Sequence, residues 1–258
     1  MFGDVVSVSH PAATFTRMKV NAPELARARP GQFLTVRCGS GVMPLLRRPL
    51  GVFSTDEGRG EIEMLFKTVG EGTRWLAERR PGDRVDLLGP IGAPFEPPTP
   101  PGRAVLVAGG VGVATMYPLA KALLEAGWSV GVLLGAATSA ELLCRDELTQ
   151  MGATVEAATE DGSAGTRGLV TDLLPSRLPG ADIVFACGPW GMMATVAEMT
   201  SKAGVPCQVS LEQRMACGTG ACMGCVVPIR GETGVDYKRV CREGPVFPAD
   251  SVAWEDVE

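Results

Sequence analysis

Four of the eight cysteines lie close together near the C-terminus, in a pattern that suits an iron–sulfur cluster. Cys217, Cys222 and Cys225 have the spacing C-x4-C-x2-C, and Cys241 follows in the segment KRVCREG. This spacing, with a distant fourth cysteine, is that of plant-type [2Fe–2S] sites. Three glycines within the loop give the backbone freedom and leave N–H groups available to the sulfur atoms. We predict that these four cysteines ligate a [2Fe–2S] cluster.

A zinc site made of four cysteines is the alternative to the cluster. Structural zinc sites usually take their cysteines as two closely spaced pairs. Here the first gap is four residues and Cys241 has no cysteine near it in the sequence. The spacing therefore favours iron and sulfide, and visible absorption of the purified chain would decide between the two.

A glycine-rich turn between a strand and a helix predicts a site for a dinucleotide. The apolar stretch 104–108 leads into Gly109, Gly110, Val111, Gly112 and Val113, and a helical pattern follows. Glycines of this kind let a pyrophosphate approach the backbone at a helix N-terminus. The match to G-x-G-x-x-G is incomplete because Thr115 takes the place of the third glycine. The alternative explanation is that these glycines only allow the turn to pack tightly.

A second candidate for the dinucleotide site is the sequence Cys187-Gly188-Pro189, which follows the strand predicted at 182–186. Ligands of open α/β sheets bind outside the carboxyl ends of the strands, although an ordinary strand-to-helix turn would use the same residues. The segment 135–139 has no arginine for a 2′-phosphate, which favours NAD over NADP. Glu141 and Glu160 are candidates for the ribose contact, without support from spacing.

Basic and glycine residues in the N-terminal part suit a diphosphate. Arg47 and Arg48 precede a proline within an apolar run, and Lys67 is followed by Gly72 and Thr73. A basic side chain and free backbone amides together bind phosphate oxygens. The alternative is a solvated arginine pair and an ordinary turn, which would have the same sequence pattern.

The elements that must position these residues fall into three parts. Short alternating stretches at 4–9, 32–37, 61–68 and 84–88 predict a small β-barrel, and the proline-rich segment 96–102 predicts a linker. Strands and helices then alternate to residue 211, with helices expected near 140–151 and 169–174 among them, which is typical of a parallel sheet covered by helices. We predict a multidomain β plus α/β protein, with a barrel at 1–99, a Rossmann-like α/β domain at 100–209 and a cluster-binding subdomain at 210–258.

Composition excludes several functions. The net charge is −5, whereas nucleic-acid binding needs a basic face. His10 is the one histidine, which rules out most histidine-based catalysis and any site with several histidines. The N-terminus has no signal-peptide pattern, and the uncharged run 104–120 is too short and too rich in glycine to span a membrane. We expect a cytoplasmic chain with reduced cysteines.

These motifs, in order and over nearly the whole chain, resemble the electron-transfer subunits of heteromeric NAD-linked dihydroorotate dehydrogenase, within the ferredoxin reductase superfamily. The resemblance rests on RRPLG at 47–51, KTVGEGT at 67–73, LLGPIGAPF at 87–95, GGVGVA at 109–114, CGP at 187–189 and SLEQRMACGTGACMGCVVP at 210–228.

The resemblance implies that the barrel holds FAD. The FAD-binding positions that it carries over are Arg48, Pro49, Leu50, Gly51, Leu65, Phe66, Lys67, Gly72 and Thr73. The family usually has serine where this chain has Gly51, so a hydroxyl that could bind the flavin is missing. The resemblance also places Cys187 near the nicotinamide of NAD. Cys38, Cys144 and Cys207 are expected to be small core residues.

The resemblance further implies a partner, an FMN-containing catalytic subunit that oxidises dihydroorotate in pyrimidine biosynthesis, in a heterotetramer of two copies of each. Electrons would pass from FMN to the cluster, to FAD and to NAD. A chain with one histidine suits this division, because proton abstraction would occur on the partner. Reductase subunits of sulfhydrogenase or of ferredoxin-dependent transhydrogenase share the same three-part plan. A non-catalytic redox sensor is a remoter alternative.

Overall fold

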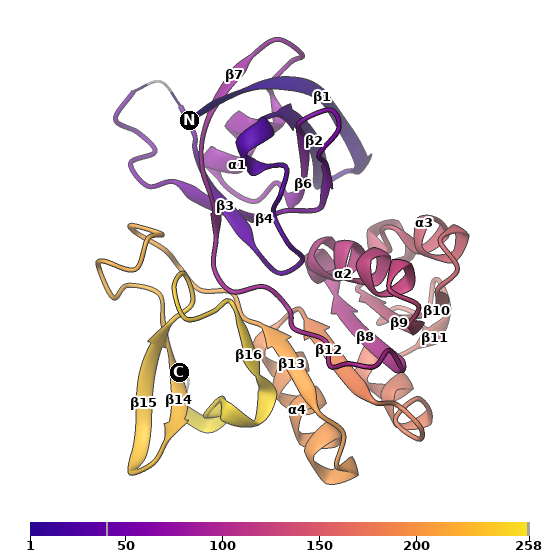
Figure 1. Cartoon of the computed structure of the whole chain (residues 1–258). Coiled ribbons are helices and arrows are strands. Elements are labelled where there is room, and N and C mark those ends of the chain that lie inside the picture. The colour runs from indigo at the N-terminus through magenta and orange to yellow at the C-terminus, as the bar shows by residue number, and fades with distance from the viewer. Residues whose placement is uncertain (40, 257–258) are drawn as a thin grey trace.

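The computed structural model describes residues 1–39 and 41–256, which form two seven-stranded sheets and a C-terminal hairpin (Figure 1). The N-terminal sheet lies above the second sheet in Figure 1, and the hairpin lies beside the second sheet, next to β16. No helix in the described part of the chain is long and apolar enough to cross a membrane.

The N-terminal sheet is antiparallel and curls around its own core. Its strand order is β4-β3-β7-β1-β2-β6-β5. The strands are β1 (Phe2–Ala12), β2 (Phe15–Asn21), β3 (Phe33–Arg37), β4 (Arg48–Gly51), β5 (Ser54–Asp56), β6 (Glu61–Lys67) and β7 (Arg84–Ile91). Alternate residues such as Met18 and Val20 point inward and are fully buried. The helix α1 (Glu71–Ala77) follows β6 and buries Leu76 in the same core.

The second sheet is parallel except at one edge. Its order is β11-β10-β9-β8-β12-β13-β16, and only β16 runs antiparallel to its neighbour. The strands are β8 (Arg103–Gly109), β9 (Ser129–Ala136), β10 (Thr154–Thr159), β11 (Thr166–Arg167), β12 (Ile183–Cys187), β13 (Cys207–Ser210) and β16 (Val246–Pro248). β16 comes from the C-terminal segment, so this segment is tied to the sheet by hydrogen bonds between β13 and β16.

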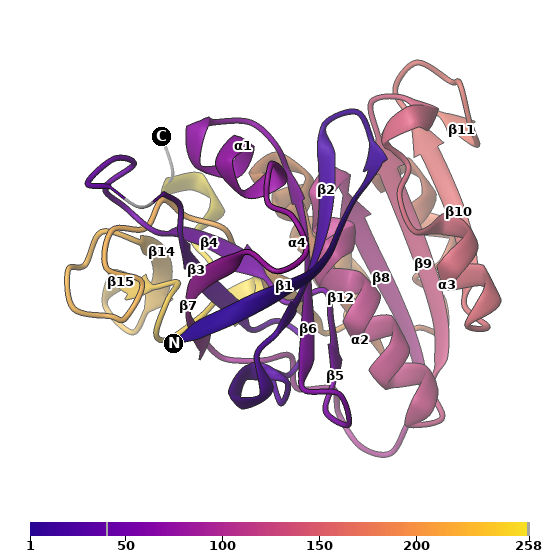
Figure 2. The same ribbon diagram turned by 90° about the horizontal axis from the view of Figure 1, so that it is seen from above.

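Helices cover both faces of this sheet, as Figure 2 shows from above. They are α2 (Val113–Glu125), α3 (Arg145–Gln150) and α4 (Trp190–Ala203). In β8, Leu106 packs with α2 and α3, whereas the next residue, Val107, packs with α4 on the opposite face. Both faces of the strand are therefore buried, which is why it appears in the sequence as a continuous apolar run.

The cysteine-containing segment lies between β13 and the hairpin of β14 (Val226–Gly231) and β15 (Gly234–Arg239). Val227 and Ile229 of β14 pack into the core that also holds α4. The segment therefore folds against the α/β sheet instead of forming a core of its own.

Two predicted helices differ from the structure. The helix expected around 140–151 is restricted to α3, because Cys144 has a left-handed backbone (φ 62°) that interrupts it. The helix expected at 169–174 is a 3-10 helix, Val170–Ser176, which contains Pro175. The segment 96–102 contains no helix or strand. The strand β2 and the helix α1 were not predicted.

Candidate functional site

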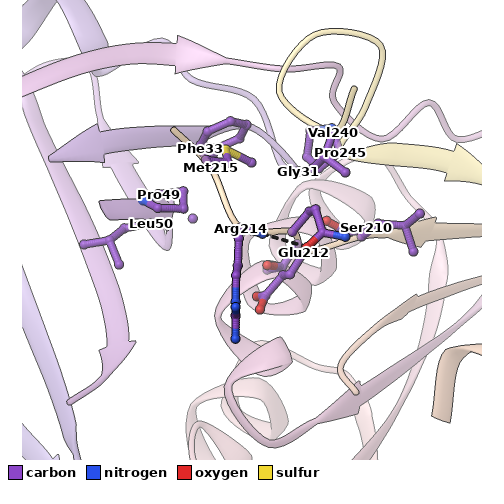
Figure 3. Close-up of a pocket in the computed structure, with 14 residues that line it drawn as sticks. Gly31, Phe33, Pro49, Leu50, Ser210, Glu212, Arg214, Met215, Val240 and Pro245 are labelled. Atoms are coloured by element: carbon purple, nitrogen blue, oxygen red, sulfur yellow. Dashed lines mark hydrogen bonds between the residues drawn. The ribbon is translucent and has the colours of Figure 1, made fainter. Parts of the chain in front are cut away.

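A cavity of about 420 Å³ lies where the three parts of the chain meet, and we call it the central pocket (Figure 3). Phe33 and Gly31 border it from the barrel, and Thr115 borders it from α2. The third wall comes from the segment that joins β13 to the cysteines and from the residue before Cys241. The residues of this wall are Ser210, Leu211, Glu212, Gln213, Arg214, Met215 and Val240.

Three of the predicted FAD-binding residues line the central pocket, and they are Pro49, Leu50 and Gly51 of β4. Arg48, the first residue of that strand, packs against α1 instead. A Cβ atom added at Gly72 would lie 2.8 Å from Arg48 Nε. The structure therefore brings together Arg48 and Gly72, two positions predicted to meet phosphate.

The side chains of the other predicted barrel residues pack in the core or bind other residues of the chain. Leu65 and Phe66 are buried on opposite sides of β6. Lys67 forms an ion pair with Glu141, with 3.0 Å between Nζ and Oε1. The Thr73 hydroxyl accepts hydrogen bonds from the backbone N–H groups of Val69 (3.0 Å) and Gly70 (3.1 Å). This hydroxyl closes the turn before α1.

A second cavity, of about 400 Å³, lies at the carboxyl ends of β8, β9 and β12, and we call it the sheet pocket. Gly109, Gly110 and Pro189 line it, as expected for the predicted dinucleotide site. Both acidic candidates, Glu141 and Glu160, also line it, and no lysine or arginine among the described residues does. A pocket with carboxylates and no basic side chain suits a ribose hydroxyl better than a 2′-phosphate.

The remaining glycines of the two turns serve close packing. A Cβ atom at Gly112 would lie 2.0 Å from the carbonyl oxygen of Cys187, and one at Gly188 would lie 3.0 Å from the backbone of Gly109. Val113 is buried in the core beneath α2. These residues hold the strand ends together, and their side-chain positions do not line the sheet pocket.

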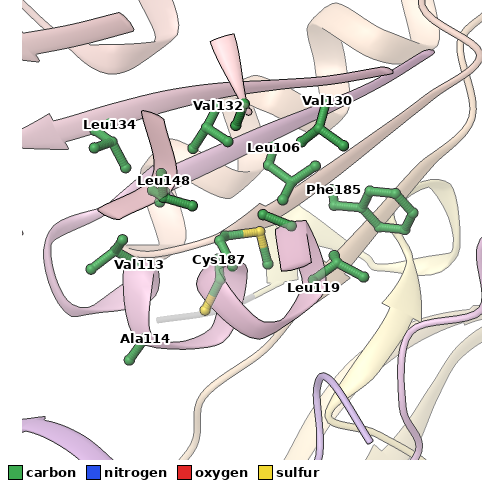
Figure 4. Close-up of a cluster of buried hydrophobic side chains, with 14 of the residues drawn as sticks. Leu106, Val113, Ala114, Leu119, Val130, Val132, Leu134, Leu148, Phe185 and Cys187 are labelled. Carbon is green, nitrogen blue, oxygen red and sulfur yellow. The ribbon is translucent and has the colours of Figure 1, made fainter. Parts of the chain in front are cut away.

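Cys187 is 1% exposed and lies among apolar side chains of the sheet core (Figure 4). Burial raises the pKa of its thiol to about 12, and the charge of Glu212 acts in the same direction. Its thiol faces the hydroxyls of Thr115 and Ser210, which both line the central pocket. Cys187 is therefore one side chain away from that pocket.

The four predicted cluster ligands lie in one region as two pairs. Cys225 and Cys241 are buried, with 3.2 Å between their sulfur atoms. Cys217 Sγ accepts hydrogen bonds from the backbone N–H groups of Thr219 (3.4 Å), Ala221 (3.3 Å) and Cys222 (3.4 Å). Across residues 1–39 and 41–256, no three metal-binding side chains lie close enough together to hold one ion.

The chemistry of this loop nevertheless fits an iron–sulfur cluster. Backbone N–H groups directed at a sulfur atom stabilise a thiolate, and they lower the pKa of Cys217 to about 5. Gly218 and Gly220 have left-handed backbones (φ 67° and 86°), and a Cβ at Gly218 would lie 2.8 Å from Thr35 of the barrel. The loop is thus shaped around its sulfur atoms and packed against β3.

An arginine at the end of β15 supports this loop. Arg239 donates hydrogen bonds to both carboxylate oxygens of Glu243 and to the carbonyl oxygen of Gly220. The bonds from Arg239 lower the pKa of Glu243 to about 2. Arg239 therefore connects the strand before Cys241 to the turn between Cys217 and Cys222.

Three family models match consecutive parts of the chain. They are described as an oxidoreductase FAD-binding domain (residues 3–95), an oxidoreductase NAD-binding domain (residues 106–198) and the iron-sulfur cluster binding domain of dihydroorotate dehydrogenase B (residues 212–253). The electron transfer subunit of dihydroorotate dehydrogenase B (NAD(+)) from Desulforamulus reducens is 41% identical over 254 residues, which cover 97% of each chain. The chain belongs to this family of electron transfer subunits.

Two further similarities agree with this assignment. The electron transfer subunit of Geobacillus kaustophilus is 42% identical over 226 residues, 87% of this chain and 86% of that protein. A structure of an NADH-dependent reduced ferredoxin–NADP oxidoreductase has a TM-score of 0.88 and 36% identity, and covers 98% of this chain and 90% of its own. As an electron transfer subunit with these three domains, the chain is an NAD-linked flavin and iron–sulfur oxidoreductase.

Sequence reasoning missed part of the central pocket in this electron transfer subunit. Thr115, Ser210 and Glu212 line this pocket and were not among the predicted site residues. Glu212 is exposed to the open space of the pocket, and partial desolvation by the surrounding protein raises the pKa of its carboxyl group. The position of Glu212 directly before the cysteine loop was the sequence feature that could have identified it as a site residue.

Proposed function

We propose that this chain accepts electrons from an FMN-containing subunit that oxidises dihydroorotate, and delivers them to NAD+ in pyrimidine biosynthesis. The proposal includes a heterotetramer with two copies of each subunit and a cytoplasmic location. It also keeps the three-part division at 1–99, 100–209 and 210–258. The relatives' name, electron transfer subunit of a dihydroorotate dehydrogenase that uses NAD(+), supports it.

The observation that carries the proposal is the composition of the central pocket. Its walls come from the barrel, from the first turn of α2 and from the residues that precede Cys217 and Cys241. Gly51, Thr115 and Met215 represent these three sources. A group bound here contacts all three parts at once, as a carrier between a cluster and a dinucleotide must.

FAD supplies two chemistries when bound, because it exchanges a hydride with NAD and single electrons with a [2Fe–2S] cluster. We propose that its ring lies in the central pocket beside Pro49, Leu50 and Gly51, and that Arg48 and the N–H groups near Gly72 meet its phosphates. The Leu65-Phe66-Lys67 segment and Thr73 would shape this site through their backbone and packing.

We propose that NAD lies in the sheet pocket, along Gly109, Gly110 and Pro189. Gly112, Val113, Cys187 and Gly188 would hold the two turns at the correct spacing. The cluster ligands in this proposal are Cys217, Cys222, Cys225 and Cys241.

The chain's own residues suit electron transfer better than proton abstraction. His10 lies on β1, is exposed, and places its Nδ1 3.2 Å from Thr16 Oγ1. It lines neither the central pocket nor the sheet pocket. The dihydroorotate chemistry therefore falls to the partner in this proposal.

The test compares the full chain alone with the chain bound to its catalytic partner. The chain alone is expected to contain FAD and a cluster, to reduce ferricyanide with NADH, and to leave dihydroorotate unchanged. The complex is expected to reduce NAD+ with dihydroorotate. Dihydroorotate oxidation by the chain alone would overturn the division of labour, and failure to turn over NADH would instead favour a redox sensor.

A variant of the cluster sharpens this test. Cys222→Ser in the complex is expected to abolish electron transfer from dihydroorotate to NAD+ while NADH oxidation by ferricyanide continues. Loss of both activities would show that the cluster has a mainly structural role. Cys38→Ser, at a buried cysteine outside the cluster, is the matched control.

One observation favours a second candidate. The NADH-dependent reduced ferredoxin–NADP oxidoreductase is similar along 98% of the chain, so a reductase subunit of a transhydrogenase would have the same architecture. The partner distinguishes the two functions. Co-purification with an FMN-containing protein that reduces NAD+ with dihydroorotate supports the first, and reduction of NADP+ in a complex without that activity supports the second.

A further inference from the structure

Two departures from the expected sequence patterns face each other in the central pocket. The resemblance described above implies a serine where this chain has Gly51, and Thr115 stands where the dinucleotide fingerprint has its third glycine. In the structure, a Cβ atom added at Gly51 would have Thr115 Oγ1 as its nearest neighbour, at 3.6 Å. The hydroxyl of Thr115 in α2 therefore lies in van der Waals contact with the point where a side chain at position 51 would begin.

The surroundings of Thr115 leave its hydroxyl available to a ligand. Thr115 lines the central pocket and is not among the residues around the sheet pocket. Thr200 in α4 donates its hydroxyl proton to the carbonyl oxygen of Val196 one turn earlier (2.9 Å). Among the side-chain hydrogen bonds of the described residues, Thr115 makes none of this kind, and its polar neighbour is the Cys187 thiol.

The neighbours of this hydroxyl explain why a ligand would use it. Cys187 is buried and keeps its proton, and Ser210 is its second polar neighbour. Thiols are weak hydrogen-bond partners, so the oxygen of Thr115 retains most of its capacity to donate and accept. On the β4 side, the pocket is bordered by Pro49, Leu50 and Gly51, whose side chains carry no hydrogen-bonding groups.

We propose that Thr115 binds the flavin ring of FAD through its hydroxyl group, in place of the serine that is missing at position 51. The inference rests on the proposed location of FAD in the central pocket. It makes Thr115 a cofactor-binding residue of this chain and explains how the change at Gly51 is tolerated.

The backbone at Gly51 allows a direct exchange of the two hydroxyls. The distance of 3.6 Å is an ordinary van der Waals contact, and the residue does not have a left-handed backbone. A serine side chain at this position therefore fits without moving the chain. Its hydroxyl would occupy the same corner of the pocket as that of Thr115.

The test measures FAD affinity of the full chain by fluorescence titration after removal of the flavin. Thr115→Val keeps the shape of the side chain and removes the hydroxyl, and it is expected to raise the Kd for FAD about 3- to 10-fold, the effect of one hydrogen bond. It is also expected to shift the visible absorption band of the bound flavin. Thr115→Ser keeps the hydroxyl and is expected to retain the wild-type affinity.

The double variant Gly51→Ser with Thr115→Val provides the decisive comparison. The serine is expected to restore the Kd and the absorption band, whereas Gly51→Ala with Thr115→Val, which adds only a methyl group, is expected to restore neither. Equal affinity of Thr115→Val and wild type would overturn the inference, as would equal recovery by serine and alanine. If the wild-type chain itself bound no FAD, the proposed flavin site would fail instead.

Discussion

Lys67, the last residue of β6, forms an ion pair with Glu141, which follows β9 and lines the sheet pocket. The pair joins the barrel to the proposed dinucleotide site. Lys67 Nζ also lies 5.4 Å from the centre of the Phe15 ring. The lysine that was predicted to hold FAD thus has a partner at the neighbouring site, and its charge offsets one of the two carboxylates there.

This arrangement makes a prediction about the choice of dinucleotide. Replacing Glu141 and Glu160 with glutamine removes two negative charges from the sheet pocket and frees Lys67. The KM for NADPH with ferricyanide is expected to fall about 3- to 10-fold, because like-charge repulsion of the 2′-phosphate disappears. The KM for NADH is expected to change less than twofold. Glu198→Gln, at an exposed pair on α4, is the control, and an unchanged KM for NADPH would contradict the prediction.

Arg17 makes a second connection between the barrel and the α/β sheet. Its guanidinium donates to Glu147 Oε1 (2.7 Å) in α3 and to Glu63 Oε2 (3.1 Å) in β6, and it lies over the ring of Phe53. Arg17→Met leaves Glu63, which is 8% exposed, without its charge partner. We expect a loss of about 2 kcal/mol in the free energy of unfolding, measured with denaturant.

The exposed pair of Arg59 and Asp56 provides the control for this measurement. Arg59→Met is expected to change stability by less than about 0.5 kcal/mol, because exposed pairs contribute little. Equal effects of the two variants would show that Arg17 has no special role in joining the two sheets.

Arg239 is expected to retain the cluster through its contacts with Gly220 and Glu243. Arg239→Met removes these bonds, so the loop between Cys217 and Cys222 should loosen and lose iron faster. The expected result is a lower cluster content per chain, measured by visible absorption and iron analysis. Arg230→Met disrupts only the exposed pair with Glu255 and should leave the cluster intact. Full cluster content in both variants would show that Arg239 is not needed to retain the cluster.

The thiol of Cys187 predicts a pH effect on stability. Its pKa is about 12 in the folded chain against an ordinary value of 9.0, so the unfolded chain loses this proton first as the pH rises. Stability should therefore fall between about pH 9 and pH 12, with no contribution from this group below about pH 8. Between pH 8 and pH 10, the free energy of unfolding is expected to fall about 1–2 kcal/mol less in Cys187→Ser than in the wild type.

The same thiol should resist modification in the folded chain. Iodoacetamide at pH 8 is expected to leave Cys187 unmodified until the chain is unfolded, as read by mass spectrometry of its peptides. Rapid labelling of Cys187 in the native chain would show that it is accessible and that its pKa is not raised.

Local features of the sequence were enough for the cluster and for the class of fold. The spacing of Cys217, Cys222 and Cys225 is a property of one short loop, because three ligands must reach the same two irons from neighbouring positions. The apolar run of β8 likewise predicted a strand buried on both faces. Such patterns need no knowledge of the rest of the chain.

The glycines after β8 show where sequence reasoning ends. Gly110 and Gly112 belong to one motif, yet Gly110 lines the sheet pocket and Gly112 fits against the carbonyl oxygen of Cys187. Which glycine meets the ligand and which meets another strand depends on how β8 and β12 pair. No local pattern contains that information.

By itself, the sequence determined the order of the three parts, the cluster-binding loop and the kinds of cofactor, because periodicity and ligand spacing act over short stretches of chain. Only the tertiary structure decided which distant residues meet. Lys67 with Glu141 and Thr115 with Gly51 are contacts between the barrel and the α/β part of the chain, and they follow from the packing of whole elements against one another. That packing minimises exposed apolar surface over the whole chain, so its outcome cannot be assigned to any single motif.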